Sequence, residues 1–165
     1  MVILGIDPAL ATTGYGVIET ARNKICLLEA GIISTSASDK LPQRLNKIYT
    51  GVSKLIGDTH PDCLVLEKLY AHYRHPTTAY LLGEARGVIC LACAQKNIPL
   101  FEYAATRIKK AIVGEGLASK LQVQRMVMNL LDIRQLLKYT DITDALALAI
   151  AHSYINECIT YGAKK

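Results

Sequence analysis

The feature that most constrains this chain is a pair of short apolar runs that each end on a carboxylate. Val2–Asp7 reads VILGID and Cys63–Glu67 reads CLVLE, and neither run alternates between apolar and polar residues. Such runs are typical of strands that are buried on both faces of a sheet. We therefore predict an α/β fold in which both runs are central strands, with residues 12–18 returning as a strand antiparallel to the first.

Asp7 and Glu67 close these two runs, and parallel strands present their carboxyl ends at one edge of a sheet, where ligands bind. We expect the two carboxylates to be neighbours in space. Adjacent buried carboxylates repel each other unless a proton or a cation intervenes, which favours a functional site. The alternative for Asp7 alone is a turn residue before Pro8.

A predicted helix from residue 141 to about 160 begins with two more carboxylates, Asp141 and Asp144. They are three positions apart and therefore share a helix face. Considered alone, they suit the N-cap and first turn of any helix. The residues that follow, ALALAIA, are small and apolar, which predicts that this helix packs on the sheet. If it crosses the two strand ends, all four carboxylates meet there.

Four carboxylates with little nitrogen or sulfur nearby form the ligand set that hard cations prefer, so we predict Mg²⁺ or Mn²⁺. Two such ions about 4 Å apart can activate a water and stabilise the leaving oxygen of a phosphodiester. This inference needs a fold that brings three distant segments together.

The net charge of +5 is concentrated in residues 104–140, which carry seven Lys or Arg against two acidic residues. Such a segment predicts a polyanion partner, with a solvated helix face as the alternative. Residues 68–76, KLYAHYRHP, mix aromatic and basic side chains that could stack bases and contact phosphates, or form an ordinary surface loop. The candidate DNA-contacting residues are Tyr70, Tyr73, Arg74, Arg107, Lys109, Lys110 and Lys120.

The rest of the chain predicts further strands at 24–35 and 99–103 and helices at 41–57, 77–96, 104–113 and from 120. Asp39 and Ser119 are the expected caps of the first and last of these helices. The apolar stretch Val88–Ala94 is expected to be fully buried or shared with a second subunit. The expected inward residues of the helix from 120 are Leu121, Val123, Met126, Val127, Leu130 and Leu131.

The length and a hydrophobic content of 51% indicate one globular domain, residues 1–165. The N-terminus lacks the pattern of a signal peptide, and the longest apolar runs are far shorter than the roughly 20 residues that span a bilayer. The five cysteines are odd in number and lie mostly in apolar runs, so we expect buried thiols in a reducing compartment. Together these features predict a cytoplasmic protein without a membrane segment.

The sequence also resembles the RuvC family of bacterial Holliday junction resolvases over nearly its full length. The matching blocks, in order, are Leu4-Gly5-Ile6-Asp7-Pro8, Thr13-Gly14-Tyr15-Gly16, Leu41-Pro42 with Arg44-Leu45, Ile48-Tyr49, Glu67, Gly83-Glu84-Ala85-Arg86-Gly87, Glu102-Tyr103-Ala104-Ala105, Val113-Gly114, Lys120 with Gln122-Val123-Gln124, and Asp141 with Asp144-Ala145-Leu146-Ala147. The number and order of these blocks make the match specific.

The resemblance implies an RNase H-like fold, a five-stranded mixed sheet flanked by helices, in a homodimer that acts on four-way DNA junctions. It implies paired nicks that leave ligatable 5′-phosphate and 3′-hydroxyl ends, and partnership with the RuvA–RuvB branch-migration complex. By carry-over, Asp7, Glu67, Asp141 and Asp144 are the metal-binding catalytic residues. Our hypothesis is that Asp7 bridges two ions and that the other three complete the ligand set. Tyr70 stands where the family often has a base-stacking aromatic residue, and Lys109 and Lys120 match its DNA-contacting basic positions.

The chain departs from the family at Ala9, where glycine is usual, and at residues 71–77, where the family has a Lys-Asn-containing loop that is one residue shorter. Three alternatives remain open at this point. They are a related nuclease acting on another nucleic acid in RNA processing, an ATP-binding lobe of the actin type, and a junction-binding protein without catalysis. The last would need a missing carboxylate, and all four are present.

Overall fold

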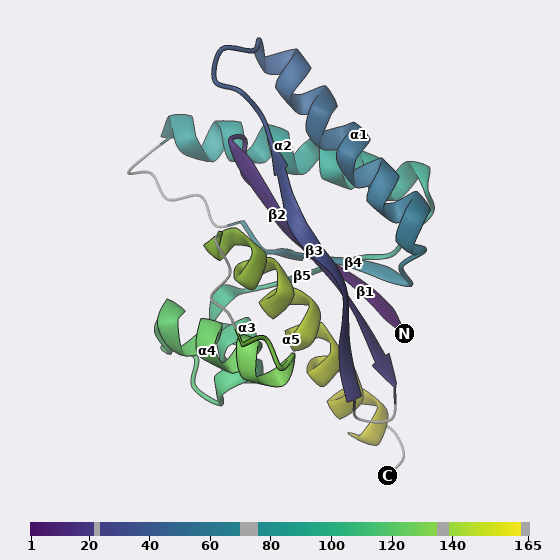
Figure 1. Ribbon diagram of the computed structural model, residues 1–165, viewed down its shortest axis with the longest axis vertical. Helices are drawn as coiled ribbons and strands as arrows, with labels where there is room; N and C mark the ends of the chain where they lie inside the picture. Colours follow the sequence, from purple (N-terminus) through teal and green to yellow (C-terminus); the bar gives the residue numbers. More distant parts are fainter. Residues whose placement is uncertain (22–23, 70–75, 135–138, 163–165) are drawn as a thin grey trace.

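The computed structural model describes residues 1–21, 24–69, 76–134 and 139–162, with side chains in these ranges except at 76 and 157–162. Its strands form one mixed sheet in the order β3-β2-β1-β4-β5 (Figure 1). The antiparallel part consists of β1 (Val2–Asp7), β2 (Thr12–Ala21) and β3 (Lys24–Ser34). The parallel part adds β4 (Cys63–Glu67) beside β1 and β5 (Leu100–Tyr103) beside β4. The predicted five-stranded mixed sheet is confirmed.

Helices cover both faces of this sheet (Figure 1). One layer holds α1 (Leu41–Thr59) and α2 (Pro76–Gln95), and the other holds α3 (Ala105–Val113), α4 (Lys120–Leu130) and α5 (Thr140–Gly162). Successive strand residues point to opposite faces, so Leu4 and Ile6 join the core under α1 and α2, whereas Ile3 joins the core under α5. Both cores consist mainly of aliphatic side chains, which fixes the register of β1.

The helix α5 lies very close to β1 and β2, because Gly5, Gly14 and Gly16 face it, the first two against its backbone and the third against the side chain of Leu146. A Cβ atom at Gly5 would overlap the backbone carbonyl oxygen of Ala145, and one at Gly14 would overlap that of Asp141. Any larger residue at either position would push the helix away from the sheet. These two glycines therefore set the height of the first turns of α5 above the strand ends.

The two predicted helix caps have different outcomes. At α4 the prediction is confirmed, because Ser119 Oγ accepts a hydrogen bond from the N–H of Gln122 at 3.3 Å. At α1 the prediction of Asp39 is wrong. The helix begins after Lys40, which is the N-cap residue. The backbone N–H of Lys40 donates to Oε1 of Gln43 at 3.1 Å, so a glutamine in the first turn satisfies the N–H of the N-cap residue.

Burial also departs from expectation in places. Val123 and Val127 of α4 are buried as predicted, but Leu121 is 51% exposed, because α4 contacts the rest of the protein along one side only. Cys63 and Cys93 are buried thiols as predicted, whereas Cys26 lies exposed on β3, the edge strand of the sheet. The side chain of the fifth cysteine, Cys158, lies outside the described residues.

The apolar helix α2 is buried on one side only. The buried residues of its inner face are Ala85, Ile89, Ala92 and Cys93. On the outer face Tyr80 is 64% exposed and Leu91 is 50% exposed. Full burial of this helix, one of the two expectations, is therefore wrong for the single chain.

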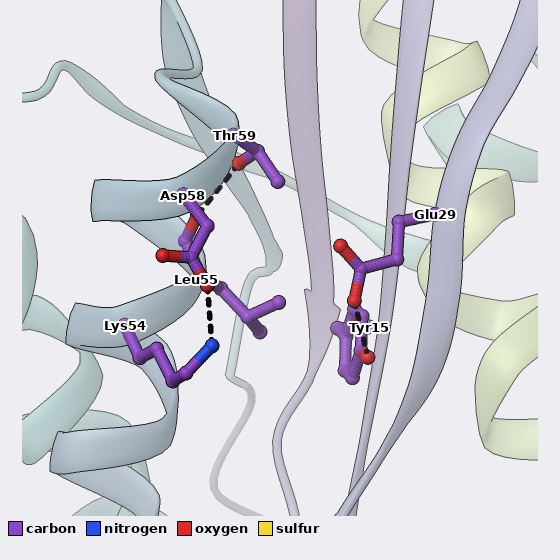
Figure 2. A network of polar contacts seen from close by, with 6 residues as sticks. All are labelled: Tyr15, Glu29, Lys54, Leu55, Asp58 and Thr59. Atoms are coloured by element: carbon purple, nitrogen blue, oxygen red, sulfur yellow. Dashed lines mark hydrogen bonds and ion pairs between the residues drawn. The ribbon is translucent and has the colours of Figure 1, made fainter.

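Polar contacts also lie on the α1 side of the sheet, the face opposite the one that carries Asp7 and Glu67. Figure 2 shows Tyr15 of β2 donating to Glu29 of β3 at 2.9 Å, and Lys54 paired with Asp58 on α1. Burial and the neighbouring Glu29 carboxylate raise the pKa of Tyr15 to about 12, so it stays a donor at all physiological pH values. Within the described part of the chain, none of the helices has the length and hydropathy that a membrane crossing needs.

Candidate active site

Asp7 and Glu67 lie at adjacent strand ends, as predicted. β1 and β4 are parallel and pair up to Ile6 and Leu66, so the next residue of each strand is the carboxylate. Side chains alternate along a strand, so both carboxylates belong to the face that also carries Ile3, Cys63 and Val65. That face is the one covered by α5.

The first two turns of α5 bring Asp144 to the same edge. Asp144 lines a hollow together with Asp7 and Glu67, and Asp141 is close enough to raise the pKa of Asp7. Asp141 does not line the hollow itself. Its backbone rests on Gly14 of β2, one turn before Asp144. The four predicted carboxylates therefore lie in one region, three around a shared hollow and one beside it.

The hollow has a volume of about 250 Å³ and a mixed lining. Its polar side chains are the three carboxylates with Lys109 of α3 and Lys120 of α4. Its apolar wall consists of Ala105, Ile108, Val123, Ala147 and Leu148. Cationic and anionic groups thus face each other across a small space whose remaining wall is apolar.

The electrostatics of the hollow show uncompensated negative charge. Burial, followed by the neighbouring carboxylates Asp144, Asp141 and Glu67, raises the pKa of Asp7, and Lys120 opposes the shift; the net result is a pKa of about 7. Burial and Asp144 likewise raise the pKa of Glu67. The Nζ of Lys120 donates to Oδ2 of Asp144 at 3.1 Å, and this contact raises the lysine's pKa. Lys109 and Arg86 also oppose the shift at Glu67, but the raised pKa values of Asp7 and Glu67 show that the nearby cations do not fully compensate for burial and for the neighbouring carboxylates.

This donor set fits a hard divalent cation. The hollow offers carboxylate oxygens and no histidine or cysteine among its lining residues, and the raised pKa of Asp7 would be relieved by an added positive charge. Among the described residues, no three acidic, histidine or cysteine side chains are drawn together tightly enough to form a ready cation cage. Repulsion between the carboxylates explains why they do not lie closer together, and Asp144 forms an ion pair with Lys120 instead.

The predicted DNA-contacting residues divide into three groups. Lys109 and Lys120 line the hollow. Arg107 lies outside it, with its guanidinium 5.2 Å from the centre of the Tyr103 ring, and Lys110 is exposed on the same helix, α3. The predicted contacts at Tyr70, Tyr73 and Arg74 lie outside the described residues.

Sequence reasoning missed a residue that contacts the site from the other helical layer. Arg86 of α2 donates to the backbone carbonyl of Glu67 at 2.6 Å and pairs with the carboxylate of Glu102. Together with Asp7 and Glu67 it lines a second hollow of about 350 Å³ on the α2 side of the strand ends. The only sequence signal was its place in the block Gly83–Gly87, which did not name a partner.

A buried histidine was missed as well. His152 of α5 is fully buried, and its Nδ1 lies 2.8 Å from the hydroxyl of Tyr103. Its Nε2 lies 3.3 Å from Sγ of Cys63 and 2.8 Å from Nδ2 of Asn156. Burial lowers the pKa of His152 and raises that of the Cys63 thiol to about 11, so this cluster holds neutral groups that tie α5 to β4 and β5.

Comparison with known proteins gives a consistent result. Residues 3–152 match the family model described as crossover junction endodeoxyribonuclease RuvC. The RuvC protein of Rhodopirellula baltica is 44% identical over 153 residues, covering 93% of this chain and 86% of that protein. That of a Janthinobacterium strain is 44% identical over 160 residues, covering 97% and 87%.

Solved structures agree with the sequence comparison. A structure of Thermus thermophilus RuvC in complex with Holliday junction substrate superposes with a TM-score of 0.91 at 28% identity and covers 97% of both chains. The yeast mitochondrial Holliday junction resolvase superposes with a TM-score of 0.61 at 10% identity, covering 96% of this chain and 85% of that one, which shows a shared fold. With its family match over residues 3–152, its RNase H-like sheet and its carboxylates at the strand ends, the chain belongs to the RuvC family of crossover junction endodeoxyribonucleases.

Proposed function

We propose that this protein is a metal-dependent Holliday junction resolvase, which makes paired symmetric nicks in four-way DNA junctions during homologous recombination and DNA repair. The observation that carries the proposal is the hollow in which Asp7, Glu67 and Asp144 face Lys109 and Lys120. Family membership supports the four-way junction as the substrate, because a relative of the same fold was solved with that DNA.

Asp7, Glu67, Asp141 and Asp144 are the proposed catalytic and metal-binding residues. They would hold Mg²⁺, or Mn²⁺ in its place, and we propose two ions for each site, with Asp7 shared between them. When bound, such ions activate a water and stabilise charge on the leaving oxygen of a phosphodiester. The support is the all-oxygen donor set and the raised pKa of Asp7.

The lysines have a separate role in this proposal. Lys109 and Lys120 lie on different helices and line the same hollow as the carboxylates, so a phosphate placed there would meet positive charge from two directions. The apolar wall beside them would limit competing water. Hydrolysis that leaves 5′-phosphate and 3′-hydroxyl ends breaks the bond to the 3′ oxygen, and it needs no covalent intermediate with the protein.

More distant DNA contacts extend from the same edge. Arg107 and Lys110 are exposed on α3, next to Lys109, and would bind the phosphate backbone. Tyr70, Tyr73 and Arg74, in the segment after Glu67, are proposed to stack on bases or contact phosphates at the junction.

We propose a homodimer, because two opposed cuts in one junction need two active sites. The outer face of α2 supports this proposal, because Tyr80 and Leu91 are exposed on it. A Cβ atom added at Gly83 or Gly87 would meet no neighbouring atom within 4 Å. A second copy could therefore pack closely on this face. Family resemblance further suggests a single nuclease domain, residues 1–165, that acts in the cytoplasm with the RuvA–RuvB complex.

The proposal is tested with a labelled mobile four-way junction, a linear duplex and a hairpin RNA, each with Mg²⁺, Mn²⁺ or EDTA. We expect paired symmetric cuts in the junction alone, and no cuts in EDTA. The variant Asp7→Asn should bind the junction without cutting it. Cutting of RNA in preference to the junction would instead favour a nuclease of RNA processing, and a fully active Asp7→Asn protein would refute the roles given to the carboxylates.

A further inference from the structure

Arg86 joins the two helical layers at the carboxyl end of β4. It projects from α2, and one guanidinium nitrogen, Nη1, donates to the backbone carbonyl of Glu67 at 2.6 Å. The other, Nη2, forms an ion pair with Oε1 of Glu102 on β5. The arginine side chain is only 11% exposed, whereas that of Glu102 is 42% exposed, so the contact lies at the boundary between the protein interior and solvent.

The chemistry of this contact requires an arginine. Burial disfavours the charged form and lowers the pKa of the guanidinium, and the carboxylate of Glu102 compensates for the buried charge. The planar fork of arginine can donate to two acceptors at once from fixed directions. A lysine at this position would keep the charge, but its single ammonium group on a flexible stem could not reproduce both contacts with the same geometry.

The carbonyl that Arg86 binds lies where the pairing of β4 with β1 ends. The pairing of β1 with β4 extends to Leu66, one residue short of Glu67. On the other side Glu67 is opposite Tyr103, and the N–H of Lys68 donates to the carbonyl of Tyr103 at 2.8 Å. Arg86 therefore adds a donor to the backbone of Glu67 beyond the end of the β1–β4 pairing.

We propose that Arg86 is a positioning residue, anchored by Glu102, which fixes the backbone of Glu67 so that its carboxylate is presented to the divalent cation. The proposal rests on the function proposed above and extends it to the α2 side of the site. Residues that orient metal ligands without contacting the metal typically change metal affinity by 10- to 100-fold when replaced. Arg86 would act in this way through the main chain.

The test compares Arg86→Lys with the wild-type protein by measuring Mn²⁺ binding calorimetrically without DNA, and then junction cleavage as a function of Mn²⁺ concentration. We expect about 10-fold weaker Mn²⁺ binding or more in the variant. Cleavage should need correspondingly more Mn²⁺ for half-maximal rate and approach the wild-type rate at saturation. Junction binding in EDTA should be unchanged.

Glu102→Gln provides a second variant that keeps Arg86 and weakens its anchor. It should shift Mn²⁺ affinity in the same direction by a smaller factor, and it carries the test if Arg86→Lys does not fold. The matched control is Arg44→Lys, because Arg44 of α1 also donates from its guanidinium to a strand-flanking carbonyl, that of Leu10 at 3.2 Å. This control should leave Mn²⁺ affinity unchanged.

Two results would overturn the proposal. One is wild-type Mn²⁺ affinity in a folded Arg86→Lys protein. That result would mean that only the positive charge at this position matters and that lysine can supply it. The other is an equal loss of affinity in Arg44→Lys, which would mean that losing any guanidinium tether loosens the site. Failure of the proposed function looks different, because the wild-type protein itself would then neither bind Mn²⁺ nor cut the junction.

Discussion

The ammonium group of Lys120 lies 3.1 Å from Oδ2 of Asp144 and links α4 to α5 at the hollow. Its side chain is 82% exposed, so this ion pair alone contributes little to stability. Its position suggests another role: Lys120 is a cation held among carboxylates that would otherwise repel an incoming phosphate. Substrate binding and catalysis should therefore depend on it more than folding does.

Lys120→Met should slow junction cleavage by about 10²–10³-fold, the usual cost of removing one electrostatic contact to a transition state. It should also reduce the slope of log affinity against log salt concentration by about one, because one phosphate contact is lost. Junction binding in EDTA at several salt concentrations measures the slope. Lys54→Met, which removes a lysine paired with Asp58 on α1, should change neither quantity, and an unchanged slope in Lys120→Met would contradict the prediction.

Asp7→Asn should stabilise the metal-free protein at pH 8. The pKa of Asp7 is about 7 in the folded protein against 3.8 without burial, so folding is penalised when this group is charged. The penalty is absent below about pH 3.8, grows as pH rises, and is complete above about pH 7. The difference corresponds to an upper limit of about 4 kcal/mol, and solvent screening at a partly exposed carboxylate reduces the expected gain to about 1–3 kcal/mol.

Denaturant unfolding in EDTA checks this expectation at two pH values. The gain in unfolding free energy from Asp7→Asn should be clear at pH 8 and much smaller at pH 5. Saturating Mg²⁺ should reverse the order at pH 8, because the wild-type carboxylates then bind cations and the variant has lost one ligand. An equal gain at both pH values would show that the folded protein does not raise the pKa of Asp7.

Gly5→Ala should damage both fold and activity, since its methyl group would overlap the carbonyl oxygen of Ala145 in α5. We expect a loss of about 2–4 kcal/mol in unfolding free energy and a displaced Asp144. The control is Gly57→Ala on α1, where no atom lies within 4 Å of the new methyl group. It should be neutral or stabilise by up to about 1 kcal/mol, because alanine favours helices. Equal stability of the two variants would refute the close approach of α5.

The strand ends could be predicted from sequence because two buried strands that end in carboxylates leave few arrangements. If β1 and β4 are parallel neighbours, Asp7 and Glu67 must lie together, and the structure has them so. The contribution of Asp144 was harder to predict. Its helix face follows from spacing, but its distance from the sheet depends on Gly5 and Gly14, whose role is visible only when α5 is in place.

The other features that the sequence did not reveal all depend on partners that are distant along the chain. Arg86 contacts Glu67 and Glu102, which lie on two different strands. His152 contacts Tyr103 and Cys63 inside the core. Local rules also failed where two residues compete for one role. Asp39 was expected to cap α1, but Lys40 is the N-cap residue, and its backbone N–H donates to Oε1 of Gln43 in the first turn. Local sequence rules indicate which residues can fill a structural role, and contacts between distant segments decide which of them does.

Leu91→Glu should convert the proposed homodimer into monomers. Leu91 is 50% exposed on the outer face of α2, and a charge there would be costly to bury against a second copy. The change lies on the opposite side of α2 from its packed face, so Mn²⁺ binding should be kept. Paired cutting should be lost, because one monomer carries one site and leaves a single nick in a cruciform plasmid where the wild-type protein produces linear DNA.

Sedimentation at several concentrations measures the assembly directly, and gel analysis of the plasmid distinguishes nicked from linear product. The matched control is Leu117→Glu, the same chemical change at a residue that is 85% exposed on the link between α3 and α4. That variant should sediment and cut as the wild-type protein does. If Leu91→Glu remains a dimer, the second copy packs on another face; if the wild-type protein is itself a monomer on the junction, the two opposed cuts require separate binding events.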